Sequence, residues 1–172
     1  LKKGTPGLRF TLGVSTFVPK AQTPFQWQGV RPEAEKRLKR LAKQLKPKGI
    51  EFRPESYGWS VIQSLLSRGD RRLAPVIAAV GEARDSIGGW KRAYRAALNH
   101  ELEPMPGPEL PEPSPWKDLV QDTWEGSRIL PWTHLRGPLS AETLRNHRDL
   151  ALERHGSVES HRVQPEGSNP ED

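Results

Sequence analysis

The residues best suited to bind a ligand lie between two expected helices, in residues 67–72. Arg68, Arg71 and Arg72 flank a Gly-Asp turn in this segment. A guanidinium can bind a phosphate or a carboxylate through two parallel hydrogen bonds, so three arginines at helix ends predict an anion site. The alternative is that Asp70 pairs with a neighbouring arginine and stabilises the turn. The sequence favours neither interpretation over the other.

A second candidate site follows an expected strand near the N-terminus. In residues 10–18 every second side chain is apolar or β-branched, which is typical of a strand. Few charges lie on either face, so we expect the strand to be covered on both sides, as in a parallel α/β sheet. Pro19 ends it because proline has no N–H to donate. The loop that follows carries Lys20, Gln22 and Thr23, and α/β proteins bind ligands in such loops.

Other catalytic and metal-binding patterns are absent from the sequence. The five histidines are never spaced like the ligands of a metal site. The chain has no cysteine, so it forms no disulfide and offers no thiolate to an iron–sulfur cluster. There is also no GxSxG, no phosphate-binding glycine loop and no HExxH. We therefore expect no metal ligands and no residue set that catalyses a reaction unaided.

The net charge of +6 is concentrated in one segment. Residues 29–49 hold eight Lys and Arg against two Glu, an excess equal to the net charge of the whole chain. Only 34% of the 172 residues are hydrophobic, and the chain starts without Met, so we expect absent sequence to supply part of the core. No apolar run reaches the ~20 residues of a membrane helix, and no signal peptide is visible. The expected location is the cytoplasm.

Apolar stripes at helical spacing predict a mainly helical chain after residue 30. Helices are expected at residues 32–46, 57–68, 73–80, 90–98 and 116–123, and from residue 141. A short strand is expected at residues 50–53. Pro75 predicts a kink or a later start in the third helix. In the second helix Trp59, Ile62 and Leu66 form one predicted stripe, with Val61 and Leu65 beside it.

Three segments of the chain carry a family resemblance. They are FVPKAQTPFQW with the strand GVS before it, IEFRPESYGWSVIQSLLSRGDRRLAPVI, and LPWTHL. Together they resemble the C-terminal part of radical S-adenosylmethionine (radical SAM) enzymes, in the branch with an upstream cobalamin-binding domain. The first two segments are quite specific, and the resemblance spans roughly residues 8–150.

The resemblance implies a fold and a set of cofactors. The chain would be an α/β fragment: the last strand and helix of a partial radical SAM (β/α) barrel, followed by a mainly helical C-terminal region. S-adenosylmethionine, a [4Fe–4S] cluster held by an upstream CxxxCxxC run, and cobalamin would serve the whole protein. The cobalamin domain of this branch points to methyl transfer. The partner implied for the chain is the N-terminal part of the same protein.

The resemblance also implies roles for particular residues. The carboxyl end of the last barrel strand would face the cofactor, which gives four candidates for the adenosyl pocket: Phe17, Val18, Pro19 and Lys20. Thr23 and Gln22 would face the substrate or the methionyl carboxylate. A direct role for Gln22 is less well supported, because family members often have a basic or aromatic residue before TP. Phe25 and Trp27 are expected in the core.

We expect five parts along the chain. These are the end of the barrel (1–55), a helical C-terminal domain (56–100), a Pro/Glu-rich linker (101–115), a short helical segment (116–152) and a disordered tail (153–172). The identity of the substrate, a small molecule or RNA, is left open by the sequence.

An alternative function, from a different class, is a basic helical module that binds RNA or a protein without catalysis. The basic helix at residues 32–46 and the arginines of residues 67–72 favour this alternative. Two features argue against it. No aromatic residue lies on the basic face to stack on bases. The expected strand also has too few partner strands in so short a chain.

Overall fold

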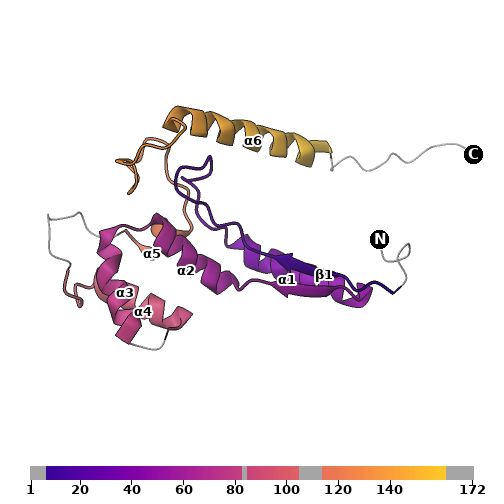
Figure 1. Cartoon of the computed structure of the whole chain (residues 1–172), viewed down its shortest axis with the longest axis horizontal. Coiled ribbons are helices and arrows are strands. Elements are labelled where there is room, and N and C mark those ends of the chain that lie inside the picture. Colours follow the sequence, from indigo (N-terminus) through magenta and orange to yellow (C-terminus); the bar gives the residue numbers. More distant parts are fainter. Residues whose placement is uncertain (1–6, 83–84, 105–113, 162–172) are drawn as a thin grey trace, which may run out of the picture.

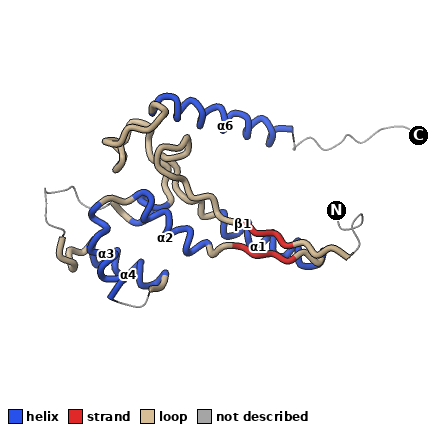
Figure 2. Tube along the Cα trace, viewed as in Figure 1, coloured by secondary structure: helices blue, strands red, loops and turns tan. Residues whose placement is uncertain are grey.

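The chain, seen in a computed structural model, is mainly helical with one small sheet (Figures 1 and 2). The structure describes residues 7–82, 85–104 and 114–161. Strands β1 (Thr11–Val14) and β2 (Glu51–Pro54) pair in parallel, with Leu12 opposite Phe52. The expected α/β class is confirmed in this coarse form, and the sheet of the described residues has two strands.

Strand β1 is shorter and more exposed than its sequence predicts. Its last bond to β2 is donated by the Glu55 N–H to the Val14 carbonyl over 2.9 Å, and the chain then turns into a helix. Since no partner continues beyond this point, the pairing stops before residue 18. The expected cover on both faces is not found among the described residues, because Thr11 and Gly13 are exposed and Leu12 is 39% exposed.

Helix α1 (Glu33–Leu45) connects the two strands and completes a β-α-β unit. Its bounds agree with the predicted helix at residues 32–46. A 3₁₀ turn, η2 (Lys46–Lys48), follows it, and Gly49 ends that turn with a φ of +61°, a conformation that favours glycine. The leucines on one side of α1 are half-buried, and its Lys and Arg side chains are exposed.

The core lies in the helical end of the molecule, away from the sheet (Figure 1). It is built by α2 (Tyr57–Arg68), the 3₁₀ turn η3 (Arg71–Leu73), α3 (Ala74–Glu82), α4 (Ile87–Leu98) and α5 (Trp116–Val120). The loop after β1 enters this core and places Trp27 and Val30 in it, both fully buried. The prediction that Trp27 is a core residue is confirmed, and Phe25 is half-buried.

The inward face of α2 agrees in part with the prediction. Trp59 and Leu66 of the predicted stripe are exposed, whereas Ile62 is buried together with Val61 and Leu65 beside it. The buried face consists of Ser60, Val61, Ile62, Ser64, Leu65 and Arg68. The Ser64 hydroxyl on this face contacts α5, where it donates to the Val120 carbonyl over 3.2 Å.

The buried face of α2 can be tested by shortening a buried side chain slightly and an exposed side chain by more. We expect Ile62→Val to cost about 1 kcal/mol of unfolding free energy, because it removes a buried methylene group. We expect Leu66→Ala to cost less than about 0.5 kcal/mol, although it removes more atoms, because Leu66 is 45% exposed. Urea denaturation of both variants measures the difference, and a larger loss for Leu66→Ala would contradict the observed face.

Helix α6 (Ala141–His161) runs along one side of the molecule (Figure 1). It begins where the sequence predicts, because the Ser140 hydroxyl accepts a hydrogen bond from the Thr143 N–H over 3.1 Å. The helix continues to His161, past Glu153, where the sequence predicts loss of structure. Residues 162–172 of the expected tail and 105–113 of the expected linker lie outside the described residues.

Two further predictions concern disulfide bonds and membrane-spanning helices. No disulfide can form, because the sequence contains no cysteine. Among the residues that the structure describes, every helix is too short or too polar to cross a lipid bilayer.

Candidate functional site

A cavity of about 920 Å³ lies where the turn between α2 and α3 meets α4, α5 and residues 124–135. We call it the arginine cavity, because four arginines line it: Arg68, Arg71, Arg72 and Arg128. The three arginines predicted from the sequence are therefore brought together, and Arg128 joins them from a distant part of the chain. Leu73, Val76, Leu119 and Leu130 contribute apolar walls.

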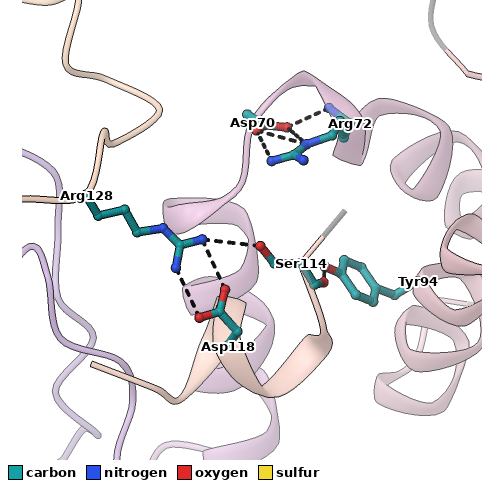
Figure 3. Close-up of polar contacts among 6 residues, drawn as sticks. All are labelled: Asp70, Arg72, Tyr94, Ser114, Asp118 and Arg128. Carbon is teal, nitrogen blue, oxygen red and sulfur yellow. Dashed lines mark hydrogen bonds and ion pairs between the residues drawn. The ribbon is translucent and has the colours of Figure 1, made fainter. Parts of the chain in front are cut away.

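Asp70 holds one of these arginines in place (Figure 3). The Arg72 Nε donates to Asp70 Oδ1 over 2.9 Å, and Nη2 donates to Oδ2 over 2.6 Å. The Arg72 backbone N–H also donates to Oδ1, so Asp70 caps η3. The alternative in which Asp70 stabilises the turn is thus shown. Burial raises the pKa of Asp70, but the Arg72 hydrogen bonds outweigh that effect and leave the pKa below its ordinary value.

The lowered pKa of Asp70 predicts a loss of stability in acid. A carboxyl whose pKa is lower in the folded state stabilises the protein above its unfolded pKa, near 3.9, and this contribution is lost as the pH falls through the folded pKa. We expect Asp70→Asn to lower the unfolding free energy at pH 6 by at most about 1 kcal/mol, because the pair is partly exposed. Asparagine keeps the capping oxygen and removes only the charge.

Urea denaturation of the wild type and Asp70→Asn at pH 6 and pH 3 measures this contribution. The gap between the two proteins should shrink in acid. A gap that stays constant between these pH values would show that the ion pair does not contribute.

Arg68 is the most unusual residue of the arginine cavity. It is only 1% exposed, and its Nη2 donates to the Asp122 carbonyl over 2.9 Å. Its guanidinium carbon lies 3.7 Å from the centroid of the Trp124 ring, within the range of a cation–π contact. Among the described residues, its Nε and Nη1 have no hydrogen-bond partner. Burial lowers the pKa of Arg68 to about 10, and the nearby Asp118 opposes that effect, so Arg68 is charged at neutral pH.

Arg128 is fixed on the other side of the arginine cavity by α5 (Figure 3). Its two terminal nitrogens donate to the two oxygens of Asp118, each over 3.1 Å. Nη2 also donates to the Ser114 hydroxyl over 3.2 Å, and the guanidinium carbon lies 4.2 Å from the Trp124 centroid. Tyr94 donates to the Ser114 carbonyl, and burial raises the pKa of Tyr94 to about 12, which keeps this phenol neutral.

The described lining of this cavity is rich in arginine. Four arginines line it, and the carboxylates of Asp70 and Asp118 pair with Arg72 and Arg128. A third carboxylate nearby, on Asp122, lies 3.3 Å from Lys117 and is balanced by it. The arrangement can bind and orient an anion. It holds no activated nucleophile among the described residues.

The residues predicted to bind a cofactor after β1 are not brought together. Phe17 is 65% exposed and contacts Phe25 edge to face, with the ring centroids 5.8 Å apart. Val18 packs against the core, and Pro19 is buried. Lys20 Nζ donates to the Ser67 hydroxyl over 2.9 Å. A separate cavity of about 290 Å³ lies between the end of β1 and α1, and of the four candidates only Phe17 lines it.

Thr23 and Gln22 stabilise their own loop. The Thr23 hydroxyl donates to the Lys20 carbonyl over 2.7 Å. The Gln22 backbone N–H donates to Gln26 Oε1, which also accepts from Trp132 Nε1 over 2.7 Å. Through Gln26 this loop is joined to residues 130–135, the segment that borders the arginine cavity.

The described residues contain no group of three His, Cys, Asp or Glu side chains that could hold a metal ion. Comparison of the chain with protein-family models, with curated proteins and with solved structures finds no match in any of the three.

Proposed function

We propose that this chain is the C-terminal part of a radical SAM enzyme. The observation that carries the proposal is the parallel β1-α1-β2 unit, in which the end of β1 and the whole of β2 belong to two of the resembling segments. Among the described residues β1 has a neighbour on one edge, and its other edge offers unpaired N–H and C=O groups. Pairing of that edge with a further parallel strand would extend the sheet toward a barrel.

The chain cannot supply every part of such an enzyme. A [4Fe–4S] cluster needs thiolates, and the chain has no cysteine, so the residues present do not fit the cluster. The residues after β1 do not form an S-adenosylmethionine site by themselves either, because Val18 and Pro19 pack inward. The role that fits this chain is a wall beside the cofactor, with Phe17 as the exposed contact.

Determining the sequence immediately upstream in the genome or transcript tests the proposal. We expect an in-frame CxxxCxxC run, and the longer protein, reconstituted anaerobically with iron and sulfide, should show cluster absorbance and release 5′-deoxyadenosine. A stop codon upstream, with no such run in frame, would refute the proposal.

The longer protein also tests the role of Phe17. Phe17→Ala should raise the KM for S-adenosylmethionine about tenfold, because an aromatic contact is lost. Trp59→Ala is a suitable control, since it removes an exposed aromatic side chain on α2, outside the segment after β1. Equal effects of the two substitutions would contradict a role for Phe17.

The alternative is a basic module that binds RNA. Its support is α1, in which no residue is fully buried and the Lys and Arg side chains are exposed. A salt titration of RNA binding separates the two proposals, because a protein that neutralises several phosphates shows a steep fall in affinity with salt. The radical SAM proposal predicts little specific binding of RNA by this chain.

A further inference from the structure

We infer that a second cavity binds a small organic carboxylate. This cavity has a volume of about 570 Å³ and lies between the loop at residues 22–27, the segment at residues 126–140 and the first turn of α6. We call it the glutamine cavity, because the buried side chain of Gln26 lines it. The inference does not depend on the proposed function, and its failure would leave the radical SAM proposal unaffected.

The first support is Gln26, which is 4% exposed and has partners for only half of its side-chain amide. Its Oε1 accepts from the Gln22 backbone N–H over 3.0 Å and from Trp132 Nε1 over 2.7 Å. Because both partners are donors, the accepting atom is the amide oxygen. The Gln26 Nε2 donates to no described residue. Unlike the buried Nε1 of Trp27, it is not enclosed by protein atoms, so its N–H groups are available to an acceptor in the cavity.

The second support is a pair of arginines in the lining of the glutamine cavity. Arg145 Nη1 donates to the Gly126 carbonyl over 3.2 Å, and the other guanidinium nitrogens of Arg145 have no hydrogen-bond partner among the described residues. The guanidinium carbon lies 5.9 Å from the centroid of the Trp27 ring, a cation–π contact that helps to hold it at the cavity wall. Arg136 is exposed in the same lining. Neither arginine forms an ion pair with a described residue.

The third support is that the described lining of this cavity contains no acidic side chain. Glu125 and Glu142 are near it in sequence, but both are exposed and neither belongs to the lining. Ser140 and Ala141 contribute the start of α6, where the first backbone N–H groups have no acceptor within the helix and the helix dipole favours negative charge. The unpartnered polar groups of the lining are therefore mainly donors, and an anion satisfies them best.

The number of donors favours a carboxylate over a phosphate. An arginine can donate two parallel hydrogen bonds to a carboxylate, and Arg145 and Gln26 together offer enough N–H groups for its two oxygens. A phosphate monoester has three terminal oxygens and close to two negative charges. The remaining arginines of the lining suit it less well, because Arg128 is already paired with Asp118 and Arg136 is exposed.

The walls of the glutamine cavity fit an apolar organic body beside the carboxylate. Leu130 and Leu144 are buried in the lining, Trp132 is half-buried, and Leu139 is 47% exposed. The volume falls within the range of about 300–1,000 Å³ that holds small organic ligands. Acetate would leave these walls in contact with water, whereas an aromatic carboxylate would cover them.

Isothermal titration of the chain with 2-naphthoate, acetate, 2-naphthol and 2-naphthyl phosphate tests the inference. We expect 2-naphthoate to bind at one site, at least about tenfold more tightly than acetate, because its rings bury apolar surface. The neutral 2-naphthol should not bind measurably, because it lacks the carboxylate. Three results would each overturn the inference: no saturable binding of 2-naphthoate, binding no tighter than that of acetate, or tighter binding of 2-naphthyl phosphate.

Two variants locate the binding. Gln26→Glu keeps Oε1 for its two partners and replaces the N–H donors with a negatively charged oxygen, so it should weaken 2-naphthoate binding at least about tenfold. Leu139→Glu changes a half-exposed residue and places a negative charge in the lining, and should weaken binding about fivefold or more. The matched control is Leu150→Glu, which adds the same charge at a 53% exposed position of α6 outside the lining and should leave the affinity unchanged.

Equal weakening by Leu139→Glu and Leu150→Glu would show general attraction to a basic protein, and would overturn the inference. Circular dichroism of each variant confirms that it is folded. If Gln26→Glu fails to fold, Leu139→Glu alone decides, and unchanged affinity in that variant would refute binding in the glutamine cavity.

Discussion

Replacing Arg68 with alanine is expected to lower the free energy of unfolding by about 3 kcal/mol. The substitution removes a partly buried hydrogen bond to the Asp122 carbonyl and the cation–π contact with Trp124. It also leaves a void where the aliphatic part of the side chain packs, since arginine stems bury apolar surface. Alanine also removes the two guanidinium nitrogens that have no hydrogen-bond partner among the described residues, and this offsets part of the lost stability.

Arg68→Met separates packing from charge. Methionine retains most of the volume and carries no donor, and replacement of buried charges by apolar residues of similar size is often neutral. We therefore expect Arg68→Met to cost about 1 kcal/mol, less than the alanine variant. Urea denaturation at pH 7 measures both, at a pH where Arg68 is charged because its pKa is about 10.

Arg92→Ala is the matched control, because Arg92 is exposed on α4. It should change the unfolding free energy by less than about 0.5 kcal/mol. An Arg68→Ala variant as stable as this control would show that the guanidinium is not packed against Trp124.

The sequence predicts those helix ends that local chemistry sets. Ser140 caps α6 with its own hydroxyl, and Gly69 follows the last turn of α2, as expected. Pro75 delays the start of α3, so that a 3₁₀ turn precedes it. None of these features depends on residues far away in the chain.

The inward face of α2 could not be predicted in the same way. A stripe is assigned by taking apolar residues as inward, but Ser64 and Arg68 are buried while Leu66 is exposed. The serine is buried because α5 covers it, and the arginine is buried because Trp124 covers it. Both causes lie in segments distant in sequence, so spacing within α2 does not reveal them.

Only part of the candidate site could be predicted, because the rest of it also comes from a segment distant in sequence. The turn at residues 67–72 carries three of its arginines, and both the anion-site and the turn-stabilising interpretations started from these residues. Arg128 and Trp124 come from a segment that folds back after α5. The available signal was Arg128, which lies four residues from both Trp124 and Trp132. This spacing does not indicate a site without the tertiary contact.

The second large effect is expected for Gly29→Ala. A Cβ at this position would lie 2.3 Å from the carbonyl carbon and oxygen of Gln121 and 2.6 Å from Arg68 Nη1. Two of these atoms are backbone and cannot rotate away. Residues 27–30 cross residues 120–124 here, and hydrogen bonds hold the two segments together on both sides of Gly29. The Val30 N–H donates to the Val120 carbonyl over 2.9 Å, and the Trp124 N–H donates to the Trp27 carbonyl over 2.7 Å.

We therefore expect Gly29→Ala to cost about 3 kcal/mol or more, since relief of the overlap must break one of these hydrogen bonds or displace Arg68. Gly13→Ala is the matched control: nothing lies within 4 Å of its Cβ, and alanine should be neutral or stabilising by about 0.5 kcal/mol. Thermal and urea unfolding of the two variants measures the contrast. Equal stability would mean that residues 27–30 do not cross residues 120–124 as closely as observed, and the buried position of Arg68 would then lose its support.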